Sequence, residues 1–212
     1  MIKVITLERE YGSGGALIAR KLAERLGWKL WDQLLTDELA RSMKCGHEDV
    51  QRREERRDPL YYRLFKSFML GSFEGNPNAP RMQFLDADCL FTATRDLVKQ
   101  AAEAGNGVIL GRGGAYFLAE RDDAYHVFVY APAEDKVRRL QESGMSAAEA
   151  KDLVRSVDAE RAAFIKKYFD LDWPTLSRYH LMINSRIGED AVVSTILKGI
   201  AVFEKRYSLR RH

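Results

Sequence analysis

Three glycines, at positions 12, 14 and 15, follow an apolar run over residues 2–7 and precede a helical pattern over residues 16–26. Glycine lets the backbone turn sharply and bring its N–H groups close to a ligand, where a helix N-terminus carries partial positive charge. The order predicts a strand, a loop and a helix, with phosphate held by Gly12, Ser13, Gly14, Gly15 and Ala16. A tight turn that binds nothing is the alternative.

The loop departs from the Walker A pattern, in which a lysine and then a serine or threonine follow the second glycine. With Gly14 as that second glycine, Gly15 stands at the lysine position and Arg9 at the first glycine position. We hypothesise that Arg9, whose guanidinium is a planar charged fork, replaces part of the lost chemistry. Ser13 is the one candidate metal ligand, and no other can be assigned.

A second glycine turn, residues 111–114, follows the apolar run 107–110 and contains Arg112. In open parallel sheets ligands bind beyond the carboxyl ends of the strands, where a guanidinium can grip a phosphate with two hydrogen bonds. Asp32 follows a short predicted strand, so we expect Asp32 and Arg112 to bind substrate in one crevice. The alternative for Arg112 is a surface ion pair with a carboxylate.

Arg155, Asp158 and Arg161 are spaced as neighbours on a helix. An ordinary ion-paired helix surface explains this spacing at little energetic gain. The functional alternative is a lid that brings Arg155 and Arg161 to a migrating phosphoryl group, whose spread charge arginines neutralise, with Asp158 at the substrate. Spacing alone favours neither.

The chain has 212 residues, 46% hydrophobic and 31% charged, with a net charge of +3, which is typical of one globular domain with an anionic small-molecule ligand. The arginines of residues 52–57 are interrupted by acidic residues, so we expect a solvated helix face and no nucleic-acid partner. Cys45 and Cys89 lack metal-ligand spacing. Without a signal peptide or a membrane-spanning run, the expected location is cytoplasmic, with no membrane partner.

Strand and helix patterns alternate along the chain. Strands are predicted over residues 2–7, 28–32, 107–110, 124–131 and 181–184, and helices over 16–26, 34–43, about 48–58, 60–70, 84–104, 133–142 and 190–207. This alternation predicts an α/β fold, a parallel sheet covered by helices on both faces. The aromatic residues of 60–73 are either core or a contact of a homodimer.

Several segments resemble, in order, motifs of the cytidylate kinase-like family, a branch of the P-loop nucleoside monophosphate kinases. They are residues 5–15 with 18–23, 108–113, 158–164 with 168–169 and 172–173, and 179–185. The resemblance runs from residue 1 to about 200. It implies one P-loop NTPase-like domain with a core of residues 1–31, 106–143 and 173–212, a monophosphate-binding insertion at about 32–105 and a helical lid at about 144–172.

The same resemblance implies a phosphotransferase that uses ATP and Mg2+ and phosphorylates CMP or dCMP. Residues 12–15 would hold the donor phosphates, Arg112 the acceptor phosphate, and Arg155 and Arg161 the transferring group. Classical members keep the P-loop lysine and a nearby threonine, where this sequence has Gly15 and Leu17. A nucleotide-binding regulator without catalysis, or a kinase for another small phosphate-bearing acceptor, therefore stays open.

Overall fold

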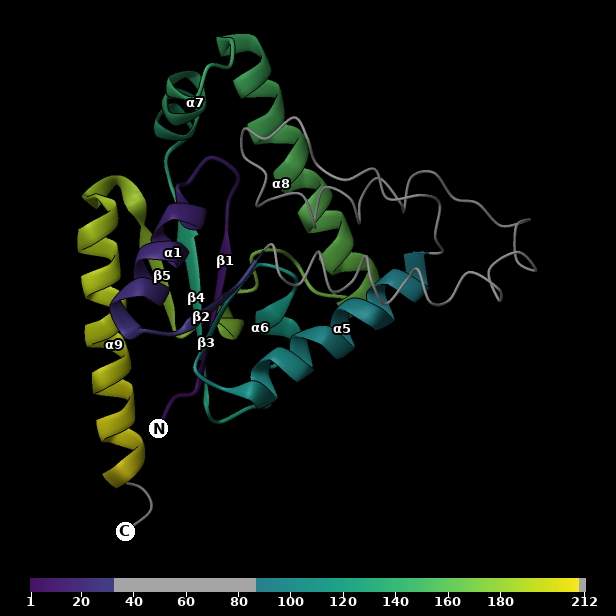
Figure 1. Cartoon of the computed structure of the whole chain (residues 1–212). Coiled ribbons are helices and arrows are strands. Elements are labelled where there is room, and N and C mark those ends of the chain that lie inside the picture. The colour runs from purple at the N-terminus through teal and green to yellow at the C-terminus, as the bar shows by residue number, and fades with distance from the viewer. Residues whose placement is uncertain (33–86, 210–212) are drawn as a thin grey trace.

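A five-stranded parallel sheet forms the centre of the computed structural model, which describes residues 1–32 and 87–209 (Figure 1). The strand order is β2-β3-β1-β4-β5, and every neighbouring pair is parallel. The strands are β1 (Val4–Arg9), β2 (Lys29–Trp31), β3 (Gly107–Leu110), β4 (Ala124–Tyr130) and β5 (Leu181–Asn184). The predicted parallel sheet is confirmed.

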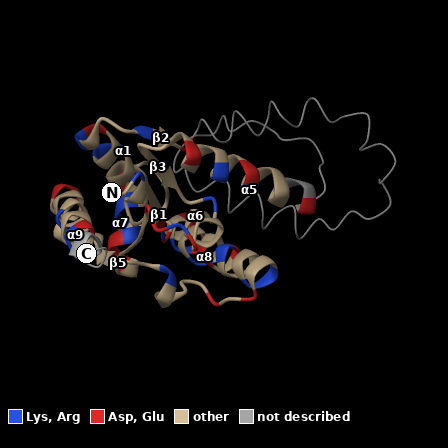
Figure 2. Ribbon diagram, turned by 90° about the horizontal axis from the view of Figure 1, so that it is seen from below, with Lys and Arg blue, Asp and Glu red and all other residues tan. Residues whose placement is uncertain are grey.

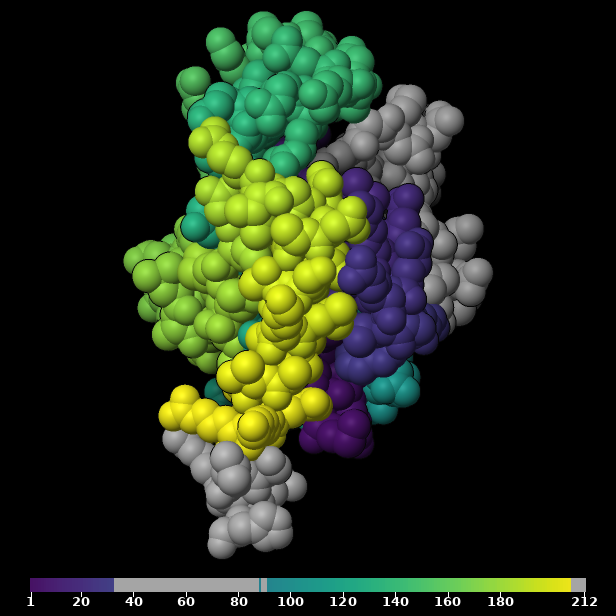
Figure 3. Space-filling view, turned by 90° about the vertical axis from the view of Figure 1, so that its left-hand side faces the viewer, coloured from purple at the N-terminus to yellow at the C-terminus, as the bar shows by residue number. Residues whose placement is uncertain are grey.

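Helices cover both faces of the sheet, as predicted. On one face α1 (Gly15–Leu26) and α9 (Glu189–Leu209) lie side by side (Figure 3). Ile18 of α1 and Ile196 of α9 join Ile5 of β1 in one buried cluster. On the other face α5 (Ala87–Ala104) and α6 (Gly114–Phe117) cover the sheet, with Val98 of α5 packed in a cluster with Val4. Burial from both sides explains why all six residues of β1 are buried.

Of two further helices, α7 (Ala133–Glu142) and the start of α8 (Ala147–Phe169) lie beyond the carboxyl ends of the strands, and α8 then runs back toward α5 and α6 (Figure 1). A capping box of Ser146 and Glu149 starts α8. Near its start, Ala150 packs against Leu140 of α7, and near its end Phe164 packs with α6. The segment expected as a lid, about 144–172, therefore contains one long helix that contacts the core at both ends. Two short 3-10 helices, η2 (Leu176–Arg178) and η3 (Ser185–Ile187), complete this part.

One strand prediction needs a correction that matters for the site. The apolar run suggested a strand over residues 2–7, but β1 runs from Val4 to Arg9. Glu8 and Arg9 pair with Phe128 and Val129 of β4. This pairing extends β1 past Leu7, its last apolar residue. Both charged residues are therefore strand residues and are buried.

The other predicted strands and helices of the described residues agree with the structure to within a few residues. The helices predicted at 34–43, 48–58 and 60–70, and the aromatic segment 60–73, lie outside the described residues. The domain boundaries stay predictions. No helix in residues 1–32 and 87–209 is long and apolar enough to cross a membrane. Figure 2 shows Lys and Arg interspersed with Asp and Glu on the described helices.

Candidate active site

Two glycine turns lie next to each other at the carboxyl edge of the sheet. β1 leads into residues 10–14, and β3 leads into residues 111–113, whose Gly111 N–H donates to Leu7 O at 2.9 Å. Gly12 and Gly14 have φ of 75° and 79°, values in the left-handed region that favours glycine. Arg112 shares this conformation, with φ 61°, although it is not a glycine. Strained backbone of this kind is concentrated at functional sites.

The first loop has the geometry of a phosphate cradle. Ser13 closes a turn, because its N–H and its Oγ both donate to Glu10 O, at 3.3 and 2.8 Å. Gly14 precedes α1 in the left-handed conformation, and no side chain of the described residues caps the helix there. The N–H groups of a first helical turn lack intrahelical partners, so those after Gly14 suit an anion. Gly12 to Gly14 thus form the turn and Gly15 and Ala16 begin α1, in the predicted order of strand, loop and helix.

The side chain of Arg9 connects the two turns. A Cβ on Gly15 would stand 2.7 Å from both Cβ and Cγ of Arg9, and a Cβ on Gly111 would stand 1.9 Å from its Nη1. Both positions therefore have to be glycine while Arg9 lies there. Arg9 is 3% exposed, and its Nε finds no hydrogen-bond partner in the described structure.

Three buried arginines surround one buried carboxylate at this edge. Arg9, Arg112 and Arg161 are 3%, 1% and 2% exposed, and Glu8 is 3% exposed. Burial lowers the pKa of Arg112 to about 10, although Asp32 partly opposes this shift, so the guanidinium stays charged at neutral pH. Burial raises the pKa of Glu8 despite the nearby charges of Arg9 and Arg161. Asp158 and Asp32 offset part of this positive charge, at Arg161 and at Arg112. Guanidinium groups are well suited to binding phosphate.

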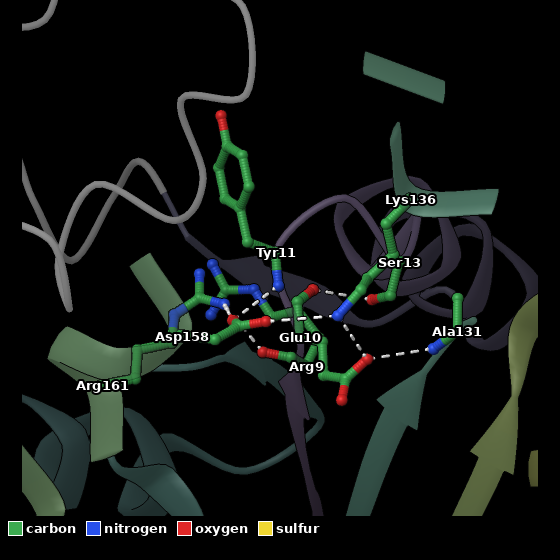
Figure 4. Close-up of polar contacts among 8 residues, drawn as sticks. All are labelled: Arg9, Glu10, Tyr11, Ser13, Ala131, Lys136, Asp158 and Arg161. Atoms are coloured by element: carbon green, nitrogen blue, oxygen red, sulfur yellow. Dashed lines mark hydrogen bonds and ion pairs between the residues drawn. The ribbon is translucent and has the colours of Figure 1, made fainter. Parts of the chain in front are cut away.

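A carboxylate of α8 ties the phosphate loop to the helices above it. Asp158 Oδ1 accepts from Tyr11 N–H at 2.8 Å and from Arg161 Nη1 at 3.0 Å (Figure 4). The same Nη1 donates to Arg9 O at 2.9 Å. Asp158 and Arg161 therefore form the ion pair that their spacing predicted, in a buried position against the loop.

A lysine of α7 completes this network. Lys136 Nζ lies 3.0 Å from Glu10 Oε2 and 3.4 Å from Asp158 Oδ2 (Figure 4). Glu10 Oε2 also accepts from the N–H of Ala131, at 3.2 Å. Burial raises the pKa of Asp158, while the charges of Arg161 and Lys136 oppose that shift. The loop is thus held from β4, α7 and α8 at once.

The structure brings together some of the predicted site residues and not others. Arg9, Arg112 and Arg161 meet around Glu8, and Arg112 Nη2 lies 3.5 Å from Asp32 O. Both oxygens of Asp158 are bound to protein groups, and its role as a substrate ligand stays a prediction. Arg155 is exposed on α8 and is not brought to the three buried arginines.

The site fits phosphate better than it fits a metal ion held by side chains. Ser13, the one predicted metal ligand, is fully buried and its hydroxyl donates to a carbonyl. Within residues 1–32 and 87–209 there is no group of three or more His, Cys, Asp or Glu that could hold a metal. Magnesium keeps several waters and is usually held by one or two carboxylates together with substrate phosphates.

Sequence reasoning missed Glu8 and Lys136. Glu8 had a detectable signal, because a carboxylate at the end of a buried strand, next to an arginine, needs a partner. Lys136 had none, since its partners Glu10 and Asp158 are 126 and 22 residues away along the chain.

Comparisons with known proteins bear on the family and the fold of this chain. The model of the cytidylate kinase-like family matches residues 4–187. A solved structure of an uncharacterized protein from Eubacterium ventriosum ATCC 27560 has 20% identity and a TM-score of 0.67, over 95% of this chain and 99% of that one. A gluconokinase from Sinorhizobium meliloti 1021 has 14% identity and a TM-score of 0.58, over 99% and 98%. A shikimate kinase from Acinetobacter baumannii, in complex with shikimate, has 17% identity and a TM-score of 0.51, over 95% and 94%.

At these identities the solved structures show the fold, which is that of P-loop kinases. A search of curated proteins found no match.

Proposed function

Since this chain belongs to the cytidylate kinase-like family, we propose that it moves the γ-phosphate of ATP to a nucleoside monophosphate, with CMP or dCMP as the acceptor. The observation that carries this proposal is the cluster of Arg9, Arg112 and Arg161, buried between two glycine turns together with Glu8, with Asp158 paired to Arg161. Transfer between two phosphate-bearing molecules concentrates negative charge at one point, and this cluster supplies the opposite charge.

The donor would lie on the first loop. The N–H groups after Gly14 would bind the phosphates of ATP, and Arg9 would supply the charge that a lysine at position 15 supplies in the Walker A pattern. Arg9 Cβ and Cγ leave no room for a lysine at position 15, and the guanidinium of Arg9 lies against Gly111. This supports a cation supplied from β1.

The acceptor would lie toward the second turn. Arg112 would grip its phosphate with two hydrogen bonds, with Asp32 beside it. Arg161 would face the transferring group, and its position is maintained by Asp158 and the carbonyl of Arg9. Arg155, exposed on α8, would join only if that helix moved.

The proposed reaction is a single displacement. An oxygen of the acceptor phosphate attacks the γ-phosphorus, the bond from that phosphorus to the β,γ-bridging oxygen breaks, and ADP leaves. The chain's own part is to position two phosphates and to neutralise their charge. Magnesium would arrive with ATP, and no described side chain is assigned to it. Such an enzyme would work in the cytoplasm on small-molecule nucleotides, and a homodimer stays a prediction.

A nucleotide-binding protein without catalysis is the second candidate, favoured by Gly15 and Leu17 where classical members have lysine and threonine. One assay separates the two candidates. ATP, magnesium and a panel of acceptors (CMP, dCMP, UMP, AMP and GMP, and a sugar phosphate) are incubated with the protein, and ADP and phosphorylated product are both measured. Product with CMP or dCMP above the rest supports the kinase. ATP binding without any product supports the second candidate.

A further inference from the structure

A lysine of α7 lies against the phosphate loop, although the first turn of α1 contains none. Lys136 of α7 is 7% exposed. A Cβ on Gly12 would stand 3.1 Å from Cβ of Lys136 and 3.1 Å from its carbonyl oxygen, so α7 packs directly on the loop. The left-handed φ of Gly12 and this close approach both favour glycine there.

The usual position for a phosphate-loop lysine is closed in this chain. A side chain at Gly15 would overlap Arg9, whose first two side-chain carbons lie 2.7 Å from the place of its Cβ. Any ammonium that reaches the donor phosphates must therefore come from another element.

The ammonium of Lys136 is held beside the loop by two carboxylates, which leave one of its hydrogen-bond donors available. Its Nζ contacts Glu10 Oε2 at 3.0 Å and Asp158 Oδ2 at 3.4 Å. A lysine ammonium has three donors, and these two carboxylates use two of them. Asp158 also accepts from Tyr11 N–H, which keeps the ammonium next to the loop backbone (Figure 4).

We propose that Lys136 is a phosphate-binding residue of the donor site, whose ammonium, positioned by Glu10 and Asp158, contacts the outer phosphates of ATP in place of the absent Walker A lysine. This inference rests on the proposed function. A lysine side chain has several rotatable bonds, and these two carboxylates leave one of its three donors for a phosphate oxygen. Glu10 and Asp158 are positioning residues in this account.

The rival explanation is that Lys136 only clamps Glu10 to Asp158. The two accounts differ in sign for Glu10→Gln, a variant of a partly exposed residue that keeps the side-chain shape. If Lys136 binds phosphate, neutralising the neighbouring carboxylate makes the electrostatic potential at its ammonium more positive. An anion should then bind equally tightly or more tightly. As a clamp, Lys136 loses its partner, and binding should weaken as it does in Lys136→Met.

The test measures binding of inorganic tripolyphosphate, ATP and adenosine by titration calorimetry. Lys136→Met should bind tripolyphosphate and ATP at least tenfold more weakly with adenosine unchanged, and Lys136→Arg should recover most of the loss. Glu10→Gln should bind tripolyphosphate at least as tightly as the unmodified protein. Lys151→Met, at an exposed position of α8, is the matched control and should change nothing.

Unchanged tripolyphosphate binding by Lys136→Met, or a loss in Glu10→Gln that matches it, overturns the inference. If Lys136→Met does not fold, Glu10→Gln and Lys136→Arg decide alone: weakened binding in both overturns it. If the unmodified protein binds neither ATP nor tripolyphosphate, the proposed donor site itself is wrong. If the unmodified protein and Lys136→Met bind tripolyphosphate and ATP equally tightly, the donor site stands and only the role of Lys136 is rejected.

Discussion

Arg9 lies over Gly15, with its Cβ and Cγ each 2.7 Å from the point where a Cβ on Gly15 would stand. Relative to the Walker A pattern, a glycine and a cationic residue have exchanged places at the two ends of the loop. The cation therefore comes from the last residue of β1 and extends toward Gly111, which joins the two glycine turns through one side chain.

This overlap predicts that restoring the Walker lysine harms the protein. Gly15→Lys should lower the free energy of unfolding by about 1–3 kcal/mol, the usual cost of overpacking a filled site. Urea unfolding of Gly15→Lys, of Arg9→Gly and of the double variant measures it. Because the two residues are in contact, the double variant should lose less free energy of unfolding than the two single variants lose together. A Gly15→Lys variant as stable as the unmodified protein would contradict the overlap.

Arg112→Lys tests the acceptor phosphate site. Lysine keeps the charge but loses the planar fork, so KM for the acceptor should rise at least tenfold, while KM for ATP stays within about twofold. Initial rates at varied concentrations of each substrate separate the two effects. Arg20→Lys, exposed on α1, is the control. An unchanged acceptor KM would remove Arg112 from the proposed site.

His126 predicts how stability depends on pH. Burial, with a smaller contribution from His180, lowers the pKa of His126 to about 4 in the folded protein. Its ordinary value is 6.5, so the unfolded chain binds a proton first as pH falls, and stability present above about pH 6.5 is lost toward pH 4. For one group with this shift, the free energy of unfolding falls by about 3 kcal/mol across this pH range.

Urea unfolding at several pH values should show this loss, and His126→Gln should reduce it. The variant also changes a 2.7 Å hydrogen bond to Thr6, so the slope with pH, and not the absolute stability, is the quantity to compare. An identical slope in both proteins would show that His126 does not cause it.

The sequence predicts secondary-structure elements better than it predicts contacts between residues that are distant along the chain. The strands at 107–110 and 181–184 and the helix at 133–142 match the structure because their hydrophobic patterns are local. The end of β1 was missed because Glu8 and Arg9 become strand residues only by pairing with β4. Arg112 could be expected at a strand end, as the fold places it. Lys136, whose partners Glu10 and Asp158 are distant in sequence, could not be found this way.

Arg9 is proposed to bind the donor phosphates from the end of β1. Calorimetric titration of ATP into the unmodified protein, Arg9→Lys and Arg9→Met, each checked for folding by thermal unfolding, tests it most directly. We expect ATP affinity to fall at least tenfold in Arg9→Met and less in Arg9→Lys, with adenosine binding unchanged. Equal affinity for ATP in the unmodified protein and in a folded Arg9→Met variant would contradict the account.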